Sequence, residues 1–68
     1  MTLSARNQLV ATVDSVTLGD IMAHVVMHIG DQQVESVITR ASAESLNLKK
    51  GDKVRAIIKS TEVMIQKD

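Results

Sequence analysis

The sequence predicts a mainly β fold of five strands, with one short helix between the third and the fourth strand. Two observations lead to this prediction. Apolar residues recur at every second position over most of the chain, which is the period of a half-buried strand. The period changes once, at Thr39, where the following residues have a composition that suits a helix.

The first three predicted strands are separated by two short turns. Residues 9–14 alternate between the two faces of a strand, and Gly19-Asp20 is typical of a turn. A second, longer strand covers 21–29 and ends at a hairpin loop over 30–32. Residues 34–38 continue the alternation as the third strand.

One helix of about two turns follows the third strand. Thr39 is a good N-cap, because its hydroxyl can accept from an amide of the first turn. The helix-compatible stretch covers 41–46. Asn47 suits the left-handed conformation that often ends a helix.

The C-terminal third predicts a turn and two further strands. Residues 49–52 form the turn, and the alternation over 54–59 predicts the fourth strand. Residues 63–65 predict a fifth strand after a break near 60–61. This order of elements is that of a small OB-like Greek-key barrel, formed by residues 1–68 as a single domain.

The predicted strands carry more apolar residues than one barrel can bury. Alternate positions that would face water in a monomer are also apolar, and they are Val10, Met22, Val26, Val37, Ile57 and Met64. The chain has 68 residues and no cysteine, so disulfides cannot compensate for a small core. Apolar surface of this extent usually marks an interface. We therefore expect an obligate homo-oligomer.

Composition excludes several classes of function. The chain has no Phe, Tyr or Trp and a formal net charge of +0, which disfavours a nucleic-acid partner. No nucleophile motif or carboxylate pair stands out, so we expect no enzymatic activity.

The N-terminus lacks the apolar region of a signal peptide. The apolar stretch 21–29 is too short to cross a bilayer and is interrupted by His24. We expect a cytoplasmic protein that makes no contact with a membrane.

Two histidines raise the question of a metal site. His24 and His28 are four residues apart on one face of the second predicted strand, a spacing of roughly 13 Å. That distance is too long for one ion within a subunit. A structural role, or a role at a symmetry axis, fits them better, and we expect no cation bound directly by the protein.

Short hydroxyls and cations point instead to an oxyanion site. Thr39 and Ser42 are one turn apart at the start of the predicted helix, where free amides favour negative charge. Both residues can equally serve only as helix caps. Arg6 and Lys59 can likewise be solvated surface charges, the usual state of isolated basic residues.

Three segments together closely resemble the molbindins, small stand-alone proteins of the molybdate-binding TOBE domain family. The segments are Ser-Ala-Arg-Asn-Gln-Leu at 4–9, Ile-Thr-Arg-Ala-Ser-Ala-Glu-Ser-Leu at 38–46, and 51–65 with its Ile-Ile-Lys-Ser-Thr-Glu run. The resemblance covers nearly the whole chain. It implies an OB-like domain that assembles as a hexamer, a trimer of dimers, with molybdate or tungstate held at the subunit interfaces.

The resemblance also implies a set of ligand residues. Carried over to this sequence, the oxyanion-binding residues are Ser4, Arg6, Thr39, Ser42, Lys59 and Ser60. Ser60 stands where the family usually has alanine. The replacement of alanine by serine keeps the backbone amide as a donor. A second class of anion site in the family implies a contribution from the turn Gly19, Asp20, Ile21 and Met22.

The implied function is intracellular binding of molybdate or tungstate, for storage or homeostasis. An alternative is an oxyanion-sensing regulatory module that acts through a separate partner, since these residues contain no helix-turn-helix and no nucleotide loop. A nucleic-acid-binding OB module is a further alternative, against which the composition argues. The site is expected to be completed by another subunit, so that binding and assembly are coupled.

Overall fold

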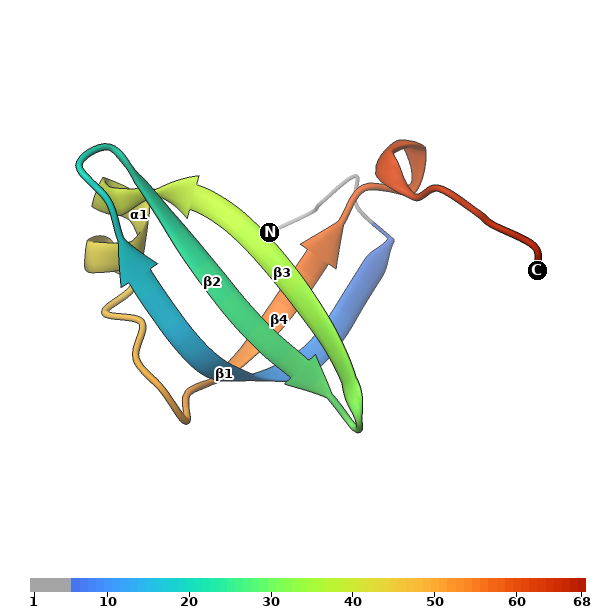
Figure 1. The fold of residues 1–68 in the computed structure, drawn as a ribbon, viewed down its shortest axis with the longest axis horizontal. Helices are drawn as coiled ribbons and strands as arrows, with labels where there is room; N and C mark the ends of the chain where they lie inside the picture. The colour runs from blue at the N-terminus through green and yellow to red at the C-terminus, as the bar shows by residue number, and fades with distance from the viewer. Residues whose placement is uncertain (1–5) are drawn as a thin grey trace.

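The structure is a computed structural model that describes residues 6–68 of the chain. Its elements are β1 (Asn7–Leu18), β2 (Met22–Ile29), β3 (Gln32–Thr39), α1 (Arg40–Ser45), β4 (Lys53–Ile58) and the 3-10 turn η1 (Ser60–Glu62). The strands form one antiparallel sheet in the order β3-β2-β1-β4, which curls around its inner face (Figure 1). The mainly β fold and the helix between the third and fourth strands are therefore confirmed.

The two hairpins follow the predicted turns. Ile29 pairs with Gln32, so only Gly30 and Asp31 connect β2 to β3. Gly30 has a φ of 61°, a conformation that glycine adopts without steric cost. At the other hairpin, the Gly19 amide donates to the carbonyl of Met22 over 2.8 Å. These short loops place β1, β2 and β3 side by side in sequence order.

The helix begins and ends as the sequence predicts. Thr39 is the N-cap, and its hydroxyl accepts from the amide of Ser42. At the other end Asn47 has a φ of 52°. The amide of Asn47 donates to the carbonyl of Glu44 and that of Leu48 to the carbonyl of Ala43. This pair of bonds is the Schellman motif, which satisfies the last carbonyls of a helix.

A bulge at Asp14 in β1 was not predicted. The pairing of β1 with β2 shifts register between Val13 and Ser15. Val13 makes two backbone hydrogen bonds to the turn before β4. Its amide donates to the carbonyl of Asp52 over 2.9 Å, and its carbonyl accepts from the amide of Gly51 over 2.8 Å. A bulge bends its strand. This one lies where the loop that follows α1 crosses β1.

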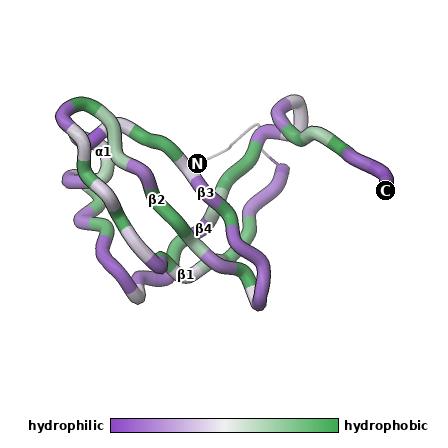
Figure 2. The backbone as a smooth tube through the Cα atoms, viewed as in Figure 1, coloured by the Kyte–Doolittle hydropathy of each residue, from purple (hydrophilic) through white to green (hydrophobic). Residues whose placement is uncertain are grey.

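The core on the inner face of the sheet is small. Its buried members are Ala11, Val13, Val25, Met27 and Ala56, with partly buried aliphatic residues packed against them. Most of the apolar positions predicted to point outward are exposed: Val10, Met22, Val37, Ile57 and Met64, while Val26 is half-buried. Figure 2 shows hydrophobic residues at intervals along all four strands of the sheet. The surplus of apolar surface is therefore present in the fold.

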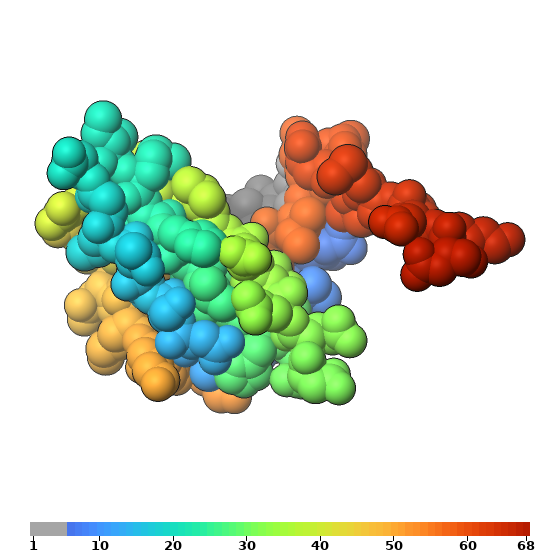
Figure 3. Space-filling model, in the orientation of Figure 1, coloured from blue at the N-terminus to red at the C-terminus, as the bar shows by residue number. Residues whose placement is uncertain are grey.

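The predicted fifth strand is absent from residues 6–68 of this single chain. After β4 the chain enters η1 and then leaves the sheet as an extended tail over 63–68 (Figures 1 and 3). Met64 and Ile65 are 94% and 93% exposed. A strand needs a neighbour to satisfy its backbone, and the tail pairs with no strand of the described residues. The described residues thus form a four-stranded sheet and not a closed five-stranded barrel.

Candidate functional site

The predicted oxyanion ligands fall into two groups in the described chain. Asn7 pairs with Ile58, which ends the ladder between β1 and β4. Arg6 and Lys59 therefore flank the last pair of this ladder, and Ser60 follows as the first residue of η1. All three side chains are exposed. We call Arg6, Lys59 and Ser60 the basic corner.

The second group is the hydroxyl pair of Thr39 and Ser42. The Thr39 hydroxyl accepts from the Ser42 amide over 3.1 Å and donates to the Ser42 hydroxyl oxygen over 2.8 Å. A threonine hydroxyl has one hydrogen, so Thr39 uses its only donor on Ser42. The Ser42 hydroxyl hydrogen remains available to an external acceptor. Thr39 therefore orients Ser42, and the Ser42 hydroxyl is the donor of this pair that is left for an external acceptor.

The turn expected to form a second anion site lies beside this hydroxyl pair. Met22 is the register partner of Thr39 across the β2–β3 ladder. The amide of Arg40 donates to the carbonyl of Ile21 over 2.7 Å, and its guanidinium donates to the carbonyl of Gly19 over 3.2 Å. The structure thus places Gly19, Asp20, Ile21 and Met22 at the start of the helix.

Arg40 was not among the residues predicted to bind an anion. Its side chain also lies 3.6 Å from the carboxylate of Glu44, one helical turn away. With Gly19 and Glu44 as partners, the guanidinium connects the β1–β2 turn to the helix. The one available signal was its position directly after the helix cap, and nothing in the sequence paired it with Gly19, 21 residues earlier.

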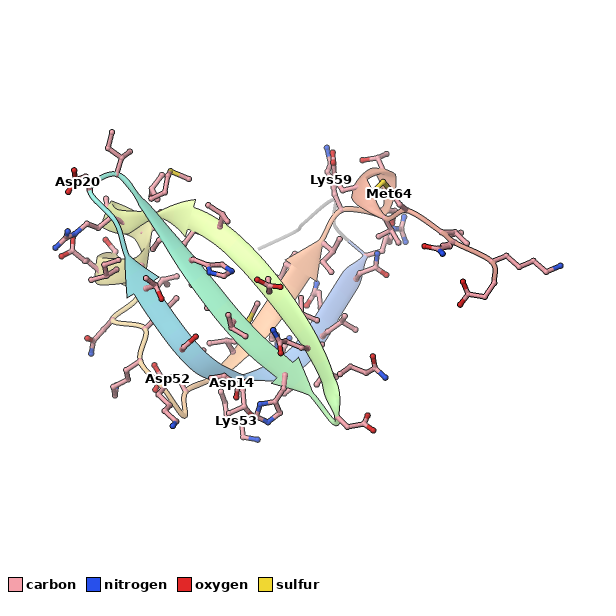
Figure 4. The ribbon with its side chains drawn as sticks, in the orientation of Figure 1. Asp14, Asp20, Asp52, Lys53, Lys59 and Met64 are labelled. Carbon is pink, nitrogen blue, oxygen red and sulfur yellow. The ribbon has the colours of Figure 1, made fainter. Side chains whose placement is uncertain are left out.

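The basic corner and the hydroxyl pair do not meet in one chain. In Figure 4, Asp20 of the turn and Lys59 lie well apart along the long axis of the molecule. Ser4, the remaining predicted ligand, lies outside the described residues. The charged half and the hydroxyl half of the predicted site are therefore presented on separate parts of the surface.

The histidines are engaged with carboxylates. His24 Nε2 lies 2.6 Å from Glu35 Oε1, and His28 Nδ1 lies 2.6 Å from Asp14 Oδ1. These pairs connect β2 to its neighbours on either side, which agrees with a structural role. Within residues 6–68, no group of three His, Cys, Asp or Glu side chains is placed to hold a metal ion. No helix in that range is long and apolar enough to cross a membrane.

Known proteins resemble this chain over almost its full length. Molybdenum-pterin-binding protein 3 of Clostridium pasteurianum is 47% identical over 66 residues, which is 96% of this chain and 97% of that protein. A molybdate-binding protein from Sporomusa ovata has a structure similar to this one, with a TM-score of 0.95, 40% identity, and coverage of 98% of this chain and 100% of the other. An apo structure of MopII from Clostridium pasteurianum gives a TM-score of 0.88 at 39% identity, covering 97% of this chain and 100% of that one.

The relatives' names are those of binding proteins, and they give no indication of a catalytic family. The TOBE domain family matches residues 3–65, which leaves only the ends of the chain outside the match. The chain is a member of the TOBE domain family.

Proposed function

We propose that this protein binds molybdate at contacts between its own subunits and has no catalytic activity. The observation that carries the proposal is the division of the site into two exposed halves. Arg6 and Lys59 supply positive charge at one place, and Ser42 supplies a free hydroxyl donor at another. Neither half can surround an anion, whereas a contact between two copies can bring them together. The names of the relatives, which include molybdate-binding and molybdenum-pterin-binding proteins, support the choice of ligand.

The chemistry of the donors suits a tetrahedral dianion. Two cations offset a charge of about −2, and hydroxyls and amides can satisfy the remaining lone pairs. Ser4, Arg6, Lys59 and Ser60 come from one subunit in this proposal, while Thr39 and Ser42 come from another. The turn over 19–22 adjoins the hydroxyl half, so an anion there would lie near the same interface. No direct bond between the metal and a protein atom is required.

The ligand class that we propose is molybdate or tungstate, rather than sulfate. Sulfate has the same charge and shape, so charge alone cannot discriminate against it. Enclosure between subunits excludes water and lowers the effective dielectric, which strengthens contacts to an anion that fills the space. A slightly larger cavity then favours the larger oxyanions.

We propose a hexamer, a trimer of dimers, as the functional assembly. The exposed apolar side chains on the outer strand faces provide surface for more than one kind of contact. The small core, in which Val13 is the only large side chain that is fully buried among the described residues, also favours stabilisation by assembly. Residues 1–68 act as one domain in this proposal, with storage or homeostasis of the oxyanion in the cytoplasm as the role.

Isothermal calorimetry with molybdate tests the assignment of the basic corner. Arg6→Ala and Lys59→Ala each remove a charge-assisted hydrogen bond worth roughly 1.5–3 kcal/mol, so affinity is expected to fall by about tenfold or more. Lys53→Ala is the matched control, because Lys53 is an exposed lysine at the opposite end of β4 (Figure 4).

A second pair of variants tests the hydroxyl half. Ser42→Ala is expected to weaken binding, whereas Ser45→Ala, at the end of the same helix, is expected to leave it unchanged. Native mass spectrometry with and without molybdate reports the subunit number and the bound anions together. Unchanged affinity in both Arg6→Ala and Lys59→Ala would remove the assignment of the basic corner.

A further inference from the structure

We propose that Arg40 is a positioning residue for anion binding, which fixes the β1–β2 turn to the start of α1 and offsets the carboxylates that lie there. The inference deepens the proposed function and rests on it, because the anion concerned is the one proposed above. Arg40 lies between the hydroxyl pair and the turn over 19–22, and it contacts the turn through both its backbone and its side chain.

Arg40 makes two hydrogen bonds to the β1–β2 turn. Its amide donates to the carbonyl of Ile21 over 2.7 Å, and its Nη1 donates to the carbonyl of Gly19 over 3.2 Å. The first bond continues the ladder between β2 and β3, in which Met22 pairs with Thr39. The second bond is made by the side chain alone. One bond sets a position, whereas two bonds to carbonyls two residues apart also set the orientation of the turn.

The turn itself is closed tightly at Gly19. The Gly19 amide donates to the carbonyl of Met22 over 2.8 Å. A side chain at this position would place its Cβ 3.0 Å from that carbonyl oxygen, which is tighter than most Cβ contacts, so the closure favours glycine. With its amide used within the turn and its carbonyl bonded to Arg40, Gly19 is held on both sides. The turn is therefore a compact unit, and its place relative to α1 depends on Arg40.

The same residue adjoins the hydroxyl pair. Thr39 directly precedes Arg40 and is both the last residue of β3 and the N-cap of α1. Because the Arg40 amide is bonded to Ile21, the backbone that carries Thr39 is fixed to the turn at the next peptide. Thr39 orients Ser42 through the 2.8 Å bond between their hydroxyls. A movement of the turn would therefore move the donor that is proposed to meet an anion.

The charge of Arg40 has a second effect. Among residues 19–22 and 39–46 Arg40 is the one basic residue, whereas Asp20 and Glu44 are acidic. Glu44 Oε2 lies 3.6 Å from Arg40 Nε, and Asp20 directly follows the glycine whose carbonyl the guanidinium holds. Figure 4 shows Asp20 on the turn, at the end of the molecule where Figure 1 places α1. Without the guanidinium, a dianion that approaches this end would meet two carboxylates and no cation from these segments.

Calorimetry with molybdate at two salt concentrations tests the effect on binding. Arg40→Met keeps an unbranched stem but removes the charge and the donors, and affinity is expected to fall by about three- to tenfold at low salt. The loss is expected to shrink at high salt, because salt screens the two exposed carboxylates. Arg40→Lys, which restores the charge, and the double variant Arg40→Met/Glu44→Gln are each expected to recover part of the affinity. Lys53→Met is the control, because it also removes one exposed positive charge but lies apart from the turn (Figure 4).

Amide hydrogen exchange in anion-free buffer tests the attachment of the turn without any ligand. Arg40→Met is expected to speed exchange of the Gly19 amide by about threefold or more, because a turn that has lost one bond opens more often. Lys53→Met is expected to leave that rate unchanged. An unchanged Gly19 rate in Arg40→Met would overturn the attachment of the turn.

The binding results separate this inference from the proposed function. Binding by the wild type that Arg40→Met leaves unchanged would overturn the role of Arg40 and leave the proposed function standing. A loss of affinity that neither salt nor Glu44→Gln reduces would also overturn that role, because it would reflect local damage to the fold alone. Absence of molybdate binding by the wild type would overturn the proposed function and, with it, the role of Arg40 in binding.

Discussion

Removing the Thr39 hydroxyl separates its role as a helix cap from its proposed role at the anion site. Thr39→Val keeps the shape and the strand preference of the side chain, but it loses the 3.1 Å bond from the Ser42 amide and the 2.8 Å bond to the Ser42 hydroxyl. Loss of an N-cap costs about 0.5–2 kcal/mol. Thr39 is exposed, so water can replace part of both bonds and the lower half of that range applies. We expect the free energy of unfolding to fall by about 1 kcal/mol.

Thermal unfolding in anion-free buffer measures this change. For a domain of this size, about 1 kcal/mol corresponds to a decrease in Tm of roughly 4–8 °C. The protein concentration must be the same for all variants, because the stability of an oligomer depends on it. Thr39→Ser is the matched control, since a serine hydroxyl can make both bonds, and it is expected to retain most of the stability.

The same variant makes a prediction for binding. With Thr39→Val, the Ser42 hydroxyl can still donate a hydrogen bond but loses the partner that orients it. Molybdate affinity is therefore expected to fall less than with Ser42→Ala. A Thr39→Val protein that melts like the wild type would refute the capping role of the hydroxyl. A Thr39→Val affinity as low as that of Ser42→Ala would show that Thr39 itself contacts the anion.

Two further substitutions test the core and the loop that is fastened to it. Met27 is 6% exposed, and Met27→Ala is expected to lower the free energy of unfolding by about 2–5 kcal/mol in urea titrations. Gln33→Ala is the control, because Gln33 is exposed and its replacement should change the free energy of unfolding little. Equal midpoints for the two variants would contradict the assignment of the core. Gly51 has a φ of 92°, and its amide donates to the carbonyl of Val13 over 2.8 Å. Gly51→Ala is therefore expected to lower the free energy of unfolding by about 1–2 kcal/mol in the same assay. An unchanged midpoint would show that this turn tolerates a side chain without strain.

Local features of the fold could be predicted from the sequence because they depend on neighbouring residues. The alternation over 21–29 indicated β2, Thr39 indicated the start of the helix, and Asn47 indicated its end. Each signal reflects a short-range cause, such as the two-residue period of a strand or a cap that bonds to the next turn. The surplus of outward apolar residues was visible for the same reason, since the side on which a strand residue points follows from its position.

Features that depend on long-range contacts could not be predicted. The bulge at Asp14 shifts the register of β1 against β2, and the adjacent Val13 bonds to Gly51 and Asp52, nearly forty residues away. The role of Arg40 depends on the turn at Gly19, which the sheet brings next to the helix. No period or motif reports such partners, because they are set by how the strands pair.

The candidate site and the predicted fifth strand show most clearly the difference between features that depend on neighbouring residues and features that depend on long-range contacts. The sequence by itself identified Arg6, Thr39, Ser42 and Lys59 as donors of the right chemistry, because residue types determine charge and hydrogen-bonding capacity. Tertiary structure decided where they lie: the ladder between β1 and β4 places the two cations at one corner, and the end of β3 places the hydroxyls elsewhere. It also left the tail over 63–68 outside the sheet that the described residues form, because after η1 the chain runs outward from the end of β4 (Figure 1).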